Sequence, residues 1–315
     1  MPEKKQTLEI DGRNLQVSHL EKVLYPAWFT KHQVIDYYLQ VSKYMLPHLK
    51  NRPVTMKRFP DGVDKPAFYE KNAPAFTPDW VKTFSVSRRE GGPGIRYILV
   101  NDLPTLAWLA NLASLEIHAF LHHAPRIQQP TSVVFDLDPG EGADILTCTE
   151  AAFLVRDLLR QFSLECFPKV SGSKGIQLYI PLNTATDYQA TQSFAKAVAD
   201  LLCRQHPDLV VSTMAKRART ARVFIDWSQN SESKTTVAVY SLRAKVDRPF
   251  VSAPVTWDEL KAALKNKRGE KLYFSPAEVL RRAERDGDLF EPVVKMKQHL
   301  PAAVAQTRAF AASSA

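Results

Sequence analysis

The sequence predicts an α+β fold in which one unit forms two lobes. Helical patterns and strand-like runs alternate along the whole chain and do not separate into blocks of either type. The chain has 315 residues, 45% hydrophobic and 24% charged, so it can bury a large core. No internal repeat and no convincing linker divide it. We therefore expect one domain over residues 1–295 and an Ala- and Ser-rich tail over 296–315.

Capping signals and apolar spacing predict six helices. Thr30 and Gln33 form a capping box, and apolar residues then follow at helical spacing up to Pro47. Pro104 suits the first turn of a second helix. The predicted helices span or begin at 31–46, Asp102, 148–163, 190–205, Thr256 and Ser275.

Between the helices lie four short runs rich in β-branched and aromatic residues, which are typical of strands. These runs are 133–138, 176–180, 223–227 and 235–240. The first contains Asp136 and Asp138, which share a face because alternate side chains of a strand point the same way. They lie about 6.6 Å apart along the strand and can share a cation, with oxygen ligands favouring Mg²⁺ or Mn²⁺. A strand that merely ends in a turn is the alternative.

A third acid repeats the same pattern, because Asp226 ends the apolar run 223–226. Three acids on two strands make a two-metal site possible, with ions about 3.5–4 Å apart. Such a site indicates phosphoryl or nucleotidyl transfer, by addition or by hydrolysis.

A short basic loop precedes the strand-like run 176–180. In the segment 169–175, glycines let backbone amides approach an anion, Ser171 adds a hydroxyl donor and Lys174 supplies a positive charge. The order of a Walker A loop is missing, and a strand follows where that loop requires a helix. A plain hairpin turn is the alternative.

The chain carries 42 Lys and Arg against 33 Asp and Glu, a net charge of +9, which favours polyanionic partners. The basic residues cluster in two loops, at Arg88-Arg89 and at Lys216, Arg217, Arg219 and Arg222. Their charges could reach a phosphate backbone, although two solvated basic loops would look the same. No run of about 18 apolar residues exists, so we expect no membrane span and a cytoplasmic protein. The three scattered cysteines fit a reducing compartment.

Several motifs, taken in order, closely resemble the polymerase domain of bacterial ligase D, a member of the archaeo-eukaryotic primase superfamily used in non-homologous end joining. The resemblance runs over roughly residues 10–290 and depends on the segments 17–26, 52–55, 115–118, 135–140, 171–175, 223–230, 234–236 and 240–243. It implies a two-lobed primase-polymerase fold whose catalytic core is a central mixed or antiparallel sheet flanked by helices. One departure is Gln177, where the family has histidine. It puts in doubt any contact that this position makes to the nucleotide.

The resemblance also implies roles for individual residues. The metal-binding, catalytic carboxylates would be Asp136, Asp138 and Asp226, with two ions, typically Mn²⁺, or Mg²⁺. The residues that would contact the incoming NTP or dNTP are Lys57, His118, Ser171, Lys174, Gln229 and Arg243. Phe68 and Tyr69 would stack on the template. A 5′-phosphate of the downstream DNA strand would be bound by His19, Lys22 and Lys31. The loops at Arg88-Arg89 and at Lys216, Arg217 and Arg219 would handle the DNA ends.

We therefore expect a template-dependent nucleotidyltransferase that extends primers and fills gaps at DNA breaks, with ribonucleotides preferred. Its expected partners are DNA with gaps, overhangs or broken ends, nucleoside triphosphates, Ku and a DNA ligase, at the nucleoid. The chain shows no K-x-D-G ligase motif. The alternatives are a freestanding primase-like polymerase, a two-metal nuclease and a non-catalytic module that binds DNA ends.

Overall fold

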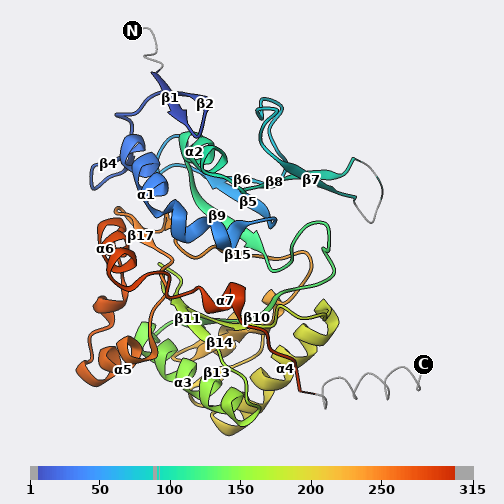
Figure 1. Cartoon of the computed structure of the whole chain (residues 1–315). Helices are drawn as coiled ribbons and strands as arrows, with labels where there is room; N and C mark the ends of the chain where they lie inside the picture. The colour runs from blue at the N-terminus through green and yellow to red at the C-terminus, as the bar shows by residue number, and fades with distance from the viewer. Residues whose placement is uncertain (1–5, 88–90, 92, 302–315) are drawn as a thin grey trace. The chain divides into compact units, whose positions relative to one another are not determined.

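The computed structural model describes residues 6–87, 91 and 93–301. Helices and strands alternate along these residues, which confirms the α+β class (Figure 1). The chain divides into two compact units, and each is assembled from separate stretches of sequence. The first unit takes residues 1–125, 235–252 and 274–288, and the second takes 126–234, 253–273 and 289–315.

The main sheet of the first unit is antiparallel, in the order β15-β9-β5-β8-β7, with β6 paired to β5. Its strands are β5 (Pro53–Arg58), β6 (Phe68–Glu70), β7 (Thr83–Val86), β8 (Ile95–Leu99), β9 (Ser114–Phe120) and β15 (Thr235–Val237). Three two-stranded ribbons add β1 (Gln6–Ile10), β2 (Arg13–Val17), β3 (Val23–Tyr25), β4 (Phe29–Thr30), β16 (Leu242–Arg243) and β17 (Phe250–Val251). The helices are α1 (Lys31–Leu49), α2 (Leu103–Asn111) and α6 (Pro276–Asp286), and α1 packs against both others.

The second unit is built on a mixed five-stranded sheet in the order β11-β12-β10-β14-β13, in which only β13 and β14 run parallel. The strands are β10 (Ser132–Pro139), β11 (Phe167–Val170), β12 (Ile176–Pro181), β13 (Val210–Val211) and β14 (Val223–Asp226). The helices are α3 (Ile145–Gln161), α4 (Tyr188–Gln205), α5 (Trp257–Asn266) and α7 (Pro292–Lys295), and the 3₁₀ turns are η1 (Lys216–Arg219), η2 (Trp227–Gln229) and η3 (Gly269–Leu272). Helices α3 and α4 contact each other and β10, the strand that carries two of the predicted acids (Figure 1).

The helices begin where side chains cap them. Thr30, Thr256 and Ser275 each accept a hydrogen bond from the third residue of the helix, and all three predicted capping boxes form. The expected end of the first helix at Pro47 was wrong, because α1 continues through Pro47 to Leu49. A proline in the last turn removes only one amide donor, so the helix survives it.

Two other boundaries differ for local reasons. Helix α3 begins at Ile145, not near 148, because the Asp144 carboxylate caps the amides of Leu146 and Thr147. The strand expected over 235–240 ends at Val237, and Tyr240 takes a positive φ of 67°. Within the described residues, no helix has the length and apolar character needed to cross a membrane.

Candidate active site

One row of residues across the sheet of the second unit is polar from end to end. Lys169 on β11 is paired with Gln177 on β12, Gln177 with Asp136 on β10, and Asp136 with Asp226 on β14. Residues directly opposite in antiparallel strands point to the same face, and Asp138 shares that face two residues after Asp136. The structure therefore brings the three predicted acids together on one face of one sheet.

Asp136 is costly to ionise in this cluster. Burial raises the pKa of Asp136 to about 7, and the charges of Asp138 and Asp226 push it in the same direction. A hydrogen bond from Gln177 and the charge of Lys169 act against this shift. Gln177, where histidine was expected, is thus a partner of Asp136, and Lys169 is a fully buried cation that sequence reasoning missed. Such a cluster favours a cation nearby.

Asp226 is held by the turn that follows it. Its Oδ1 accepts hydrogen bonds from the amide of Ser228 (2.9 Å) and the hydroxyl of Ser228 (2.5 Å), and its Oδ2 accepts one from Gln229 Nε2 (3.2 Å). The ammonium of Lys234 donates to the same Ser228 hydroxyl. Across the ranges that the structure describes, no three His, Cys, Asp or Glu side chains already converge as a ligand set for one ion.

Asn230 fixes this turn to the neighbouring strand. Its side chain accepts from the Val134 amide (2.8 Å) and donates to the carbonyls of Val134 (2.7 Å) and Trp227 (2.9 Å). Because β14 pairs with β10 only from Asp136 onward, Asn230 continues the ladder where the strand has stopped. The buried amide therefore sets the position of Asp226 and Gln229 relative to β10.

The predicted anion loop is a hairpin that joins β11 to β12. Ser171 Oγ accepts from the amides of Ser173 and Gly175, both at 3.2 Å, and the Ser171 amide donates to the Gly175 carbonyl. A Cβ on Gly175 would lie 2.3 Å from the Leu137 carbonyl oxygen and 3.3 Å from Asp138 Oδ1, so only glycine fits there. The segment is therefore a hairpin turn, which was one of the two interpretations of the sequence. It rests on β10, the strand that carries Asp136 and Asp138, and it leaves Lys174 exposed.

The first unit holds a second polar cluster, centred on Glu116 of β9. Lys57, His118 and Arg243, three predicted nucleotide contacts, all lie within 3.7 Å of its carboxylate. Tyr69 lies beside them, with the Lys57 ammonium 5.3 Å from its ring centroid. Sequence reasoning missed Glu116, although Glu116 and His118 show the same alternate spacing as Asp136 and Asp138.

The other predicted contacts in the first unit lie on its surface or support it. Phe68 and Tyr69 on β6 are 58% and 63% exposed, which is unusual for large aromatic residues and leaves their rings accessible. Lys22 Nζ pairs with Asp61 at 2.9 Å, whereas Lys31 is buried and donates to the Ser18 carbonyl. His19 lies next to Ser18 and takes a positive φ of 53°.

The predicted basic loops are described in part. Lys216 begins η1, Arg217 is exposed, and the Arg219 guanidinium stacks 3.7 Å from the Phe224 ring centroid. Gly140 packs below this loop, because a Cβ there would collide with the Arg219 carbonyl. Arg88 and Arg89 lie outside the described residues.

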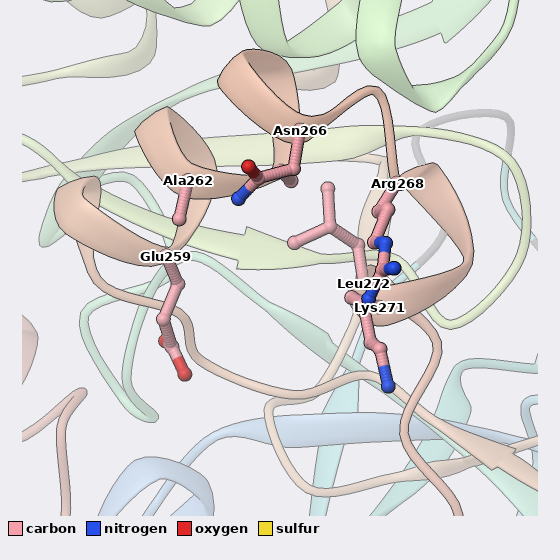
Figure 2. Close-up of a pocket in the computed structure, with 7 residues that line it drawn as sticks. Glu259, Ala262, Asn266, Arg268, Lys271 and Leu272 are labelled. Carbon is pink, nitrogen blue, oxygen red and sulfur yellow. The ribbon is translucent and has the colours of Figure 1, made fainter.

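A pocket of about 260 Å³ lies elsewhere in the second unit, between α5 and η3. Figure 2 shows side chains that line it, among them Glu259 and Asn266 of α5, and Arg268 and Lys271. None of the predicted site residues lines it, and Glu259 already serves the capping box of α5. The pocket therefore adds nothing to the predicted site.

The profile of the family described as "LigD, primase-polymerase domain" matches residues 30–290. The chain belongs to this family. The multifunctional non-homologous end joining protein LigD of Mycolicibacterium smegmatis is 41% identical over 282 residues, which cover 89% of this chain and 36% of that protein. The bifunctional non-homologous end joining protein LigD of Bacillus subtilis is 35% identical over 252 residues, or 79% of this chain and 40% of that protein.

A solved structure supports the same assignment. The polymerase domain of Mycobacterium tuberculosis ligase D in complex with DNA is 42% identical, with a TM-score of 0.83 over 90% of this chain and 99% of that one. The family membership confirms the resemblance inferred from the motifs. The chain spans little more than a third of the length of the curated relatives that it matches.

Proposed function

We propose that this chain is a template-dependent nucleotidyltransferase that extends DNA primers and fills gaps at breaks in non-homologous end joining. The observation that carries the proposal is the sheet face on which Asp136, Asp138 and Asp226 come together, in a member of the LigD primase-polymerase family. The relatives named for end joining and the neighbour solved with DNA support the substrate class. We place this proposed activity at the nucleoid, in the cytoplasm.

The donor set of this face fits divalent cations. Carboxylate oxygens are the ligands that Mg²⁺ and Mn²⁺ prefer, and a cation beside Asp136 would offset the burial and the neighbouring charges that raise the pKa of this carboxyl. Asp136, Asp138 and Asp226 would hold two ions, with Mn²⁺ favoured. When bound, such ions favour the ionised 3′-hydroxyl and offset charge on the leaving pyrophosphate.

The chain's own residues would orient the nucleotide. In the second unit, the exposed Lys174 ammonium and the Ser171 loop would bind phosphate oxygens, while Gln229 would link the nucleotide to the turn that holds Asp226. In the first unit, Lys57, His118 and Arg243 would bind the triphosphate. The proposed substrates are NTPs and dNTPs, with ribonucleotides preferred.

Other residues would bind DNA. The exposed rings of Phe68 and Tyr69 would stack on the template, and His19, Lys22 and Lys31 would recognise a 5′-phosphate. Lys31 would contribute from a buried position, where its ammonium donates a hydrogen bond to the Ser18 carbonyl. The basic loops, which include Lys216, Arg217 and Arg219, would contact the DNA ends, with Ku and a ligase as further partners.

The decisive experiment changes two acids. The double variant Asp136→Ala/Asp138→Ala should lose primer extension on a 5′-phosphorylated gapped duplex but keep its affinity for that duplex, measured by fluorescence anisotropy. Asp208→Ala, which removes an exposed carboxylate of the same unit, should extend normally. Continued synthesis by the double variant would overturn the assignment. Shortening of a labelled primer with Mn²⁺ and no nucleotide would indicate a nuclease.

A further inference from the structure

Glu116 is a carboxylate buried beside two cationic side chains, Lys57 and Arg243, and the imidazole of His118. Only 1% of it is exposed. Lys57 Nζ lies 3.7 Å from its Oε1, His118 Nε2 lies 2.9 Å from its Oε2, and Arg243 Nε lies 3.7 Å from the same Oε2. The Ala244 amide also donates to Oε1 at 3.1 Å, which ties the carboxylate to the backbone that follows Arg243.

These contacts come from three different strands. Glu116 and His118 share one face of β9, Lys57 lies directly opposite Glu116 on β5, and Arg243 lies on β16. No short segment of sequence could hold these three side chains together, and the like charges of Lys57 and Arg243 repel. The central carboxylate contacts all three.

Glu116 stays ionised in this setting. Burial by itself would raise the pKa of Glu116, but the hydrogen bond from His118 and the charges of Arg243 and Lys57 lower it to about 2. Arg243 Nε is buried and has no hydrogen-bond partner among the described residues, although it lies 3.7 Å from Glu116 Oε2. An arginine N–H group in this position can donate to an arriving anion.

We propose that Glu116 is a positioning residue, which holds Lys57, His118 and Arg243 in one constellation that binds the triphosphate of the incoming nucleotide. This inference rests on the proposed function. Glu116 acts through these three side chains and does not touch the substrate. Its role is to keep two cationic groups and an imidazole at fixed places before the nucleotide arrives.

Glu116 could instead serve only to neutralise the positive charge of the cluster. Loss of its charge would then strengthen the attraction of the cluster for a triphosphate. The structure argues against this outcome. Burial lowers the pKa of Lys57 and of His118, and the Glu116 carboxylate opposes both shifts. Without the carboxylate, the buried lysine and histidine would lose protons more readily, and the guanidinium would lose its fixed partner.

The test measures nucleotide binding and extension separately. For Glu116→Gln we expect the Kd for ATP with Mn²⁺, measured by calorimetry without DNA, and the KM for nucleotide in primer extension to rise by at least about tenfold. The kcat at saturating nucleotide should change by less than about threefold, because ground-state positioning of the triphosphate is restored at high concentration. Glu116→Asp, which keeps the charge but withdraws it by one methylene, should give intermediate values.

The matched control is Glu70→Gln. Glu70 forms a comparable ion pair with Arg58 at 2.7 Å on the adjacent strands, outside the cluster, so its loss should leave Kd and KM unchanged. Equal or tighter ATP binding by Glu116→Gln would overturn the inference. If that variant does not fold, wild-type values for Glu116→Asp would overturn it equally. Failure of the proposed function looks different, since the wild-type protein itself would then not bind ATP or extend a primer.

Discussion

Asn230 shows how one amide side chain can stabilise the fold and position a proposed metal ligand. It satisfies both backbone groups of Val134, on the strand that carries Asp136, and also the Trp227 carbonyl. It is fully buried, so water cannot replace these bonds. Asn230 therefore ties the turn that holds Asp226 to β10, beside the ladder pairing of Asp226 with Asp136.

We predict that Asn230→Ala lowers the free energy of unfolding by about 3 kcal/mol, because it leaves both buried backbone groups of Val134 without the side-chain partner that they have now. Urea unfolding followed by circular dichroism measures this loss. Asn266→Ala, at an exposed position of α5, should change the stability by less than about 0.5 kcal/mol. An unchanged urea midpoint for Asn230→Ala would mean that the turn is held by other contacts.

The sequence alone located Asp136, Asp138 and Asp226 because strand periodicity and strand ends are local patterns. It did not show that Lys169 pairs with Gln177, or Gln177 with Asp136, because the register depends on both strands together and cannot be read from one strand alone. Glu116 was missed for a related reason. Its meaning depends on Lys57 and Arg243, which lie 59 and 127 positions away in the printed sequence.

The Ser171–Gly175 hairpin is an element whose shape depends on one missing side chain. Any Cβ at Gly175 would overlap the Leu137 carbonyl, so the hairpin can rest on β10 only with glycine there. This contact places the exposed Lys174 next to the strand of the acids. The loop chemistry was predictable from sequence, but the close approach that requires Gly175 was not.

We predict that Gly175→Ala lifts the hairpin from β10 and lowers primer extension by at least about tenfold, since a shift of about 1 Å at a reacting group can cost more than that. Steady-state extension at saturating DNA measures the effect. Gly287→Ala is the control for a glycine replaced away from the hairpin, because its Cβ would meet open space. It should extend at the wild-type rate, and equal rates for both variants would contradict the proposed contact.

Helices and strands differed in how well the sequence predicted them. The helix starts at Thr30, Thr256 and Ser275 were correct because capping boxes are local signals. Most strands of the first unit were not predicted, since short, half-exposed strands such as β6 and β7 owe their conformation to partners elsewhere in the chain. Tertiary pairing decided these segments.

At the scale of the whole molecule, each unit is discontinuous in sequence. The chain leaves the first unit after Pro125, returns for 235–252 and again for 274–288. Within the second unit, the Val170 amide bonds to the Ala253 carbonyl and the Val255 amide to Pro168, so residues beyond 252 complete the edge of its sheet. Because each unit is assembled from several separate stretches of the chain, no single linker divides the sequence into two continuous domains.

The net charge of +9 belongs to the chain as a whole and predicts strongly salt-dependent DNA binding. If Lys22 contacts a 5′-phosphate, Lys22→Ala should lower the slope of log affinity against log salt by about one, on gapped DNA that carries this phosphate. On the unphosphorylated gap its slope should match that of the wild type.

Lys65→Ala, which removes an exposed lysine paired with Asp64, is the control and should behave alike on both substrates. Anisotropy titrations from 50 to 200 mM salt measure these slopes. An equal loss on both substrates for Lys22→Ala would show that Lys22 adds only general positive charge, and would remove it from the 5′-phosphate pocket.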